Sequence, residues 1–140
     1  MFQDTQEMAR DWASDRKIDV IPVVYSLMNR ESSNGFLSGT VTRDTVFANN
    51  NLNKRYDRDE VNERVDYIGK LSYLIRDKVK NMAQAALRWV LDNPPVSLVL
   101  SGVKNANELQ EAVVASSLQP FSEADHKRAN EIHPHDFQAA

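Results

Sequence analysis

The spacing of apolar residues predicts two successive helices in the middle of the chain. From Glu60 onward, apolar side chains return at steps of three and four residues, which is the period of an amphipathic helix lying on a core. The apolar positions of this helix are Val61, Val65, Ile68, Leu71 and Ile75. The next segment, Met82 to Leu91, is apolar on nearly every side, and Asp92-Asn93-Pro94-Pro95 ends it sharply. We expect this second segment to be the most buried helix.

Local signals predict three more helices. Residues Asp4 to Arg16 carry apolar side chains one helical turn apart among charged ones. Asn105 with Glu108, and Ser122 with Asp125, have the three-residue spacing of a capping box, in which a side chain bonds a free backbone N–H at the start of a helix. We therefore expect helices that begin after Asn105 and after Ser122.

Two short runs rich in β-branched residues predict strands. The runs Ile18–Val24 and Val96–Leu100 have the nearly continuous apolar character of buried parallel strands. Residues 40–59 are polar and charged and predict a long loop, and residues 133–140 predict a frayed tail. Each strand is followed by a helix, which is the order of parallel βα units. Since two strands leave bare edges, we expect the chain to associate with a second copy or with another chain.

Composition narrows the fold and the partners. A length of 140 residues with 41% hydrophobic side chains is that of one domain, residues 1–140. The 17 basic and 20 acidic residues are mixed along the chain, which predicts no nucleic-acid partner. No apolar run approaches the roughly 20 residues that span a bilayer, so we expect a cytoplasmic protein without membrane contact. With no cysteine and three histidines, we expect no disulfide and no metal site.

Several motifs together resemble the C-terminal part of aldo-keto reductases. The segment Met82–Pro94 looks like the penultimate helix of that family, and Val96-Ser97 with Gly102-Val103-Lys104-Asn105 looks like its last barrel strand and cofactor loop. Gly35-Phe36-Leu37-Ser38-Gly39, and Leu118–Ile132 at the end, match in order and spacing. The resemblance implies an α/β fold, namely a partial (β/α)8 barrel. That part would hold the C-terminal βα units 7 and 8, be rich in helix and contain two short parallel strands.

The place of the first strand in such a barrel has two interpretations. Tyr25-Ser26-Leu27 matches the motif that ends the seventh strand of the family, which requires no deletion. The same residues also resemble the end of the sixth strand, which would remove one helix-strand unit and put Pro22 where the family has a glutamine. We favour strand 7 for Ile18–Val24, because two neighbouring barrel strands then remain.

The resemblance also implies a site for the cofactor NADP(H). It would place Tyr25 against the nicotinamide ring, and the glycines would let the backbone approach the pyrophosphate closely. The residues that it assigns to cofactor binding are Tyr25, Ser26, Leu27, Gly35, Leu37, Gly39, Gly102, Lys104 and Glu108. The competing interpretation is a half-buried aromatic residue and ordinary turn glycines. Glu108 and Ala112 depart from the family, which commonly has glutamine and asparagine there, and an acid would repel a 2′-phosphate.

The resemblance places no catalytic residue in this chain. The family's Asp, Tyr, Lys and His tetrad lies in the N-terminal half of the barrel, which has no counterpart here. Lys54, Tyr56 and Asp57 lie in the charged loop outside any family register, and we interpret them as solvated loop residues. We therefore expect a cofactor-binding segment that is not catalytic alone. The alternatives are an interaction module without cofactor, forming a homo-oligomer, and one subunit of a split reductase.

Overall fold

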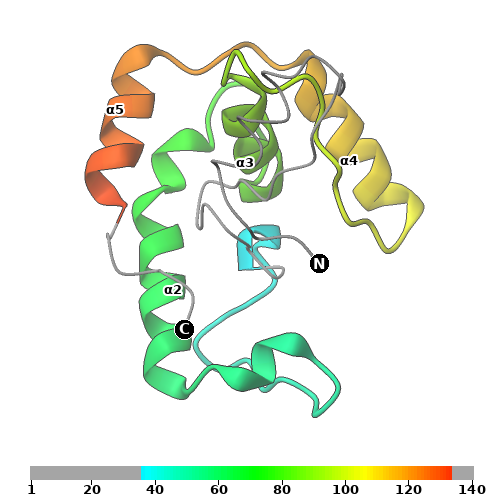
Figure 1. Ribbon diagram of the computed structural model, residues 1–140, viewed down its shortest axis with the longest axis vertical. Coiled ribbons are helices and arrows are strands. Elements are labelled where there is room, and N and C mark those ends of the chain that lie inside the picture. Colours follow the sequence, from blue (N-terminus) through cyan, green and yellow to red (C-terminus); the bar gives the residue numbers. More distant parts are fainter. Residues whose placement is uncertain (1–35, 134–140) are drawn as a thin grey trace, which may run out of the picture.

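The computed structural model describes residues 36–133. The predicted helix Asp4–Arg16, the predicted strand Ile18–Val24 and the tail after His133 lie outside the described residues, so these predictions are not tested. The described part consists of helices joined by loops (Figure 1). The α-helices are α2 (Arg58–Lys70), α3 (Met82–Leu91), α4 (Ala106–Ser117) and α5 (Glu123–Ile132). The 3-10 helices are η1 (Phe36–Ser38), η2 (Leu52–Arg55) and η3 (Ser72–Leu74).

The helices begin where local capping groups satisfy free backbone N–H groups. The side chain of Asn105 accepts a hydrogen bond from Glu108 N at the start of α4, and Ser122 forms a full capping box with Asp125 at the start of α5. Both predicted helix starts are confirmed. Asp57 and Glu60 form a further capping box, so α2 begins at Arg58 rather than at Glu60.

The predicted helix from Glu60 is shorter than its apolar pattern. It ends at Lys70, and the chain continues through Leu71 into η3. Leu71 and Leu74 are completely buried, whereas Ile75 is 40% exposed. Leu71 and Leu74 therefore reach the core from the turn and 3-10 helix that follow α2. They do not reach it from a longer α2.

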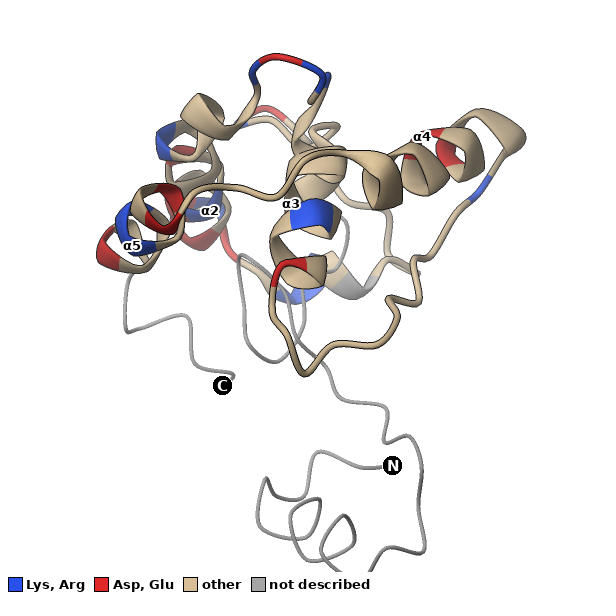
Figure 2. Cartoon of the chain, turned by 90° about the horizontal axis from the view of Figure 1, so that it is seen from above, with Lys and Arg blue, Asp and Glu red and all other residues tan. Residues whose placement is uncertain are grey.

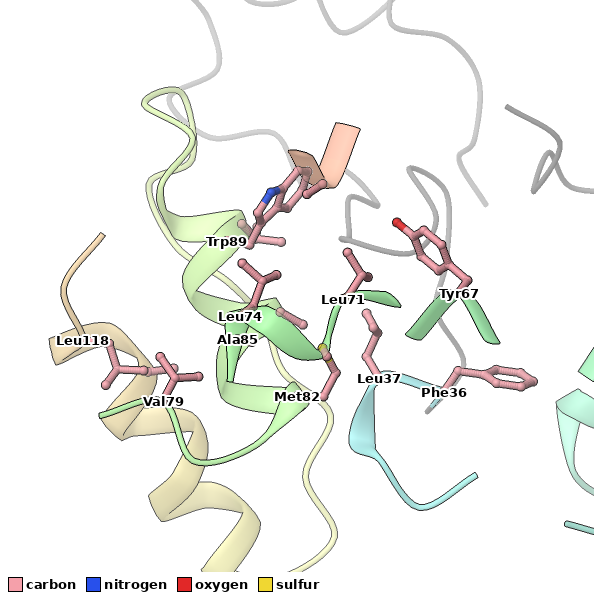
Figure 3. Close-up of a cluster of buried hydrophobic side chains, with 14 of the residues drawn as sticks. Phe36, Leu37, Tyr67, Leu71, Leu74, Val79, Met82, Ala85, Trp89 and Leu118 are labelled. Carbon is pink, nitrogen blue, oxygen red and sulfur yellow. The ribbon is translucent and has the colours of Figure 1, made fainter. Parts of the chain in front are cut away.

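Helix α3 is the most buried of the described helices, as predicted. It spans the predicted residues Met82–Leu91, and its side chains from Met82 to Val90 face α4, η1 and η3. Figure 3 shows Met82, Ala85 and Trp89 directed into this cluster. The buried core members are Phe36, Leu37, Val61, Tyr67, Leu71, Leu74, Val79, Met82, Ala85, Ala86, Trp89, Val90, Ala115, Leu118 and Ala129. Burial of this cluster from water is the main source of stability for the described part.

The predicted strand Val96–Leu100 is wrong for the structure. These residues form no strand, and the described part of the chain contains no strand with which they could pair. Val96 and Val99 pack against the core, while Leu98 and Leu100 are exposed by 56% and 85%. A strand would put residues 96, 98 and 100 on one face, so the inward spacing of three rules out a regular strand geometry. Of the two parallel strands predicted for the α/β fold, the second, Val96–Leu100, is therefore not formed in the described part.

Buried polar contacts attach α5 to the rest of the fold. The Asp92 carboxylate at the end of α3 accepts hydrogen bonds from Arg88 Nε at 2.8 Å and from Phe121 N at 2.9 Å. It also lies 3.1 Å from His126 Nε2 on α5. Its side chain is only 4% exposed, so this carboxylate joins two helices from inside the protein. Between residues 36 and 133, no helix is both long and apolar enough to cross a membrane.

Candidate functional site

The residues assigned to cofactor binding fall into three groups in the chain. Tyr25, Ser26, Leu27 and Gly35 lie outside the described residues, so their positions are not tested. The other five lie at two places: one group lies in η1 and just after it, and the other precedes and opens α4. The members described are Leu37, Gly39, Gly102, Lys104 and Glu108.

The first place is the turn at the end of η1. Leu37 is 7% exposed and its side chain points into the core beside Met82 (Figure 3). It can therefore offer only its backbone to a ligand. Gly39 has φ of 76°, the left-handed region that favours glycine, and a Cβ atom there would meet nothing within 4 Å among the described residues. The turn thus presents an open stretch of backbone held by two buried neighbours, Phe36 and Leu37.

The second place is the turn that opens α4. Gly102 is exposed, and no atom of residues 36–133 lies within 4 Å of where its Cβ would be, so these residues leave its backbone open to a ligand. Glu108 Oε2 accepts a hydrogen bond from Lys104 N at 2.7 Å, and its Oε1 accepts one from Asn105 Nδ2 at 3.0 Å. A carboxylate of the chain itself therefore occupies the anion-favouring start of this helix. The Lys104 side chain is exposed beside it.

Both places expose backbone, and neither of them lines the two hollows described next. Both glycines have open space around them, and the start of α4 adds one lysine. Two hollows on the described surface lie elsewhere, one along α5 and one of about 200 Å³ between residues 45 and 61. The chemistry that fits the glycine turns is backbone contact to a phosphate, and the Glu108 carboxylate opposes a further negative charge next to it.

The contacts of Asp57 and Tyr56 are structural, and Lys54 is exposed. Asp57 caps α2 by accepting a hydrogen bond from Glu60 N at 2.9 Å. The Tyr56 ring contacts Phe36 edge-on and lies under the guanidinium of Arg64, 4.0 Å from the ring centroid. Lys54 is exposed on η2. The interpretation as solvated loop residues therefore holds for Lys54 but is wrong for Tyr56, which is half-buried.

A carboxylate with a lowered pKa lies at the start of α5, away from both glycine turns. The Arg76 guanidinium holds the pKa of the Asp125 carboxyl well below its usual range, with hydrogen bonds from Ser122 acting in the same direction. Arg76 Nη1 donates to Asp125 Oδ1 at 3.0 Å, and Ser122 Oγ donates to Oδ2 at 2.6 Å. Neither the local patterns nor the resemblance indicated this contact, since Arg76 and Asp125 are far apart in sequence. It is a structural ion pair that fixes α5.

Two tyrosines of the described part have raised pKa values. Burial raises the pKa of Tyr67 well above its usual value, because the charged phenolate would be poorly solvated there. Burial also raises the pKa of Tyr73, whose hydroxyl donates to the Asp125 backbone oxygen at 3.0 Å. Among residues 36–133, no three His, Asp or Glu side chains come together as they do around a metal ion.

Comparison with known protein families gives one assignment. The family model described as the aldo/keto reductase family matches residues 1–134. Comparisons with curated proteins and with solved structures gave no match. The match covers nearly all of the 140 residues and includes both glycine turns, α3 and the start of α4. The chain therefore belongs to the aldo/keto reductase family.

Proposed function

We propose that this chain supplies part of the NADP(H)-binding surface of an aldo-keto reductase and does not supply its catalytic tetrad. The observation that carries the proposal is the pair of open glycine turns, at Gly39 and Gly102, within a chain that belongs to this oxidoreductase family. Both turns offer backbone that a phosphate can approach without meeting a side chain.

The proposal gives each turn a different part of the cofactor. The backbone at Leu37 and Gly39 contacts the pyrophosphate, together with Ser26, Leu27 and Gly35, and Tyr25 stacks on the nicotinamide ring. The backbone at Gly102 and the Lys104 ammonium face the 2′-phosphate of the adenosine end. When bound, the cofactor supplies a hydride for carbonyl reduction. This chain binds and orients the cofactor, and groups outside it donate the proton.

Glu108 sets the strength of this binding. Its carboxylate already accepts the hydrogen bond of Lys104 N and lies next to the lysine that would hold the phosphate. A phosphate must therefore either displace the carboxylate or tolerate its charge. Loss of one charge-assisted contact of this kind costs about 1 to 3 kcal/mol, or about tenfold or more in affinity. We expect affinity for NADPH in the micromolar range or weaker.

A second function is favoured by a separate observation. Exposed apolar side chains gather on α4 and on the segment before it, which supports association with a second copy or with a complementing chain. The chain would then act as an interaction module. The two functions differ in one measurable property, since only the first requires the dinucleotide.

Titration of the purified chain with NADPH, followed by fluorescence and calorimetry, tests the first proposal. We expect saturable binding that Lys104→Ala weakens by about tenfold, because a charge-assisted contact to phosphate is lost. Lys127→Ala is the matched control, because Lys127 is also an exposed lysine but lies on α5. Its substitution should leave the affinity for NADPH unchanged. Absence of binding at millimolar NADPH, or equal effects of both substitutions, would contradict the proposal.

A further inference from the structure

The turn at the end of η1 and the turn that opens α4 are supported by the same part of α3. Both η1 and α4 pack against α3. In η1, the Leu37 side chain lies beside Met82 (Figure 3). In α4, Glu111 accepts hydrogen bonds from Asn81 and Gln84. The N-cap and first turn of α3 therefore contact two elements that are far apart in sequence, and each of these elements carries one of the glycine turns.

The contact between α3 and Glu111 consists of two hydrogen bonds from oriented donors. Asn81 Nδ2 donates to Glu111 Oε2 at 2.9 Å, and Gln84 Nε2 donates to the Glu111 backbone oxygen at 3.4 Å. Gln84 is only 2% exposed, and its Oε1 accepts a hydrogen bond from Lys80 N at 2.9 Å. Asn81 is fixed as the N-cap of α3, because its Oδ1 accepts a hydrogen bond from Gln84 N at 2.9 Å. Each donor is thus held in place by a second hydrogen bond of its own amide group.

Within the described part, α4 is buried near its C-terminal end and open near its start. Ala115 and Leu118 are buried, and Arg88 Nη1 donates to the Leu118 backbone oxygen at 3.4 Å. Residues 101–110 are exposed. Figures 1 and 2 both show α4 beside α3, with the first turn of α4 at the outer edge. Glu111 therefore lies between the anchored end of the helix and the turn that opens it.

We propose that Asn81 and Gln84 position the turn at Gly102 and Lys104 for the adenosine end of the dinucleotide, by holding α4 through Glu111. The inference rests on the proposed cofactor binding and adds how the two turns act as one site. A ligand that contacts both turns gains from the second contact only if the turns are held at the matching separation. A tilt of α4 about its buried end moves its first turn most. The three residues are therefore positioning residues, which act through α4 and not by contact with the cofactor.

Affinities for the whole cofactor and for its adenosine half test this positioning role. Amide chemical shifts of the intact chain measure the dissociation constants of NADPH and of adenosine 2′,5′-bisphosphate. We expect Glu111→Ala to weaken NADPH binding by about threefold to tenfold, because the two turns are no longer held together. The affinity for adenosine 2′,5′-bisphosphate should change by less than about twofold, since this ligand contacts the α4 turn alone. Gln110→Ala, an exposed neighbour on α4, is the matched control and should leave both affinities unchanged.

Electrostatics alone predicts the opposite result for Glu111→Ala. The substitution removes a negative charge, which by itself favours binding of a phosphate. Weaker binding of NADPH would therefore report the lost hydrogen bonds and not the lost charge.

A reciprocal exchange of donor and acceptor tests the contact itself. Asn81→Asp keeps an oxygen that caps α3 but replaces the donor to Glu111 with a second carboxylate oxygen, so it should also weaken NADPH binding. Asn81→Asp combined with Glu111→Gln restores one donor and one acceptor at the original net charge. This pair should return the affinity to within about twofold of the wild type. Asn81→Asp combined with Glu111→Ala has the same net charge without the hydrogen bond, and it should not recover.

The outcomes distinguish this inference from the cofactor proposal. Absence of NADPH binding by the wild type at millimolar concentration contradicts the proposed function. Wild-type binding that is unchanged in Glu111→Ala overturns the positioning role alone. Equal losses for NADPH and for adenosine 2′,5′-bisphosphate would overturn it as well, because Glu111 would then affect the α4 turn itself. The same conclusion follows if the exchanged pair recovers no more affinity than its charge-matched control.

Discussion

Asp125 shows how one side chain serves several parts of the fold. Its carboxylate closes the capping box of α5 with Ser122 and also receives the Arg76 guanidinium from the loop after η3. The first role follows from residue spacing and was predicted. The second requires residues that are distant in sequence to meet, and nothing local indicates it. Nothing local places the Leu37 side chain in the core either; it lies there because η1 packs against α2 and α3.

The Asp125 contacts predict a loss of stability in acid. Because the folded pKa lies below the unfolded value of about 3.9, the stabilisation is fully present above that pH and is lost as the pH falls below it. Asp125→Asn should lower the free energy of unfolding at pH 7 by about 1 to 2 kcal/mol and should reduce its decline between pH 5 and about 3. Urea unfolding as a function of pH measures both quantities.

The control for this prediction is Glu131→Gln. Glu131 is an exposed carboxylate on the same helix, with side-chain exposure of 64% and a lysine at 3.9 Å. Its substitution should change stability at pH 7 by less than about 0.5 kcal/mol and leave the acid dependence intact. Equal acid dependence in the wild type and in Asp125→Asn would show that the contact with Arg76 does not contribute as described.

Glu108 makes a second prediction at the scale of a single residue. Glu108→Gln removes the negative charge beside Lys104 and keeps an oxygen that can accept the hydrogen bond of Lys104 N. We expect NADPH to bind roughly fivefold to tenfold more tightly, a gain of about 1 kcal/mol, while the helix content is unchanged. Calorimetric titration measures the affinity, and Glu123→Gln on α5 is the control. Weaker binding in Glu108→Gln would mean that its carboxylate contacts the cofactor favourably.

The helices of the described part were predictable because their signals are local. Met82–Leu91 is apolar on nearly every side and is bounded by Asn81 and by two prolines, and the structure has α3 over those residues. The segment Val96–Leu100 has an equally apolar composition, but a strand forms only when another strand offers its hydrogen-bonding groups. In the absence of such a partner in the described part, these residues follow the surface of the core instead. Composition alone does not contain that information.

The Asp92 carboxylate gives the prediction for the contact between α3 and α5. Asp92→Ala removes the acceptor for Arg88 Nε, for Phe121 N and for His126, and leaves the Arg88 charge in a site where that side chain is only 11% exposed. We expect a loss of about 3 to 5 kcal/mol in the free energy of unfolding. Amide hydrogen exchange should become faster in α5 first, because α5 loses its attachment at His126.

The control for Asp92 is Asp44→Ala, which removes an exposed carboxylate from the long loop. That substitution should stay within about 0.5 kcal/mol of the wild type. If Asp92→Ala lowers stability no more than Asp44→Ala does, the Asp92 contacts contribute no net stabilisation. If stability falls but α5 keeps its slow exchange, the carboxylate acts within α3 and not between the helices.

For the whole molecule, family and site differ in how far the sequence determines them. The family follows from motifs spread over nearly the entire chain, and the match over residues 1–134 confirms it. The surface that would hold the cofactor is built from turns that are remote in sequence, at Gly39 and at Gly102, and its completion also depends on Tyr25 to Gly35. The resemblance names candidate residues for such a surface, whereas their relative placement depends on the packing of η1, α3 and α4.

Amide chemical shifts of the intact chain during titration with NADPH test the central claim most directly, since they report each turn separately. The account predicts that the amides of Gly39, Gly102 and Lys104 shift together with a single dissociation constant, while amides of α5 do not move. Shifts confined to residues 45–61 or to α5, or no shift at millimolar NADPH, would contradict a dinucleotide surface formed by the two glycine turns.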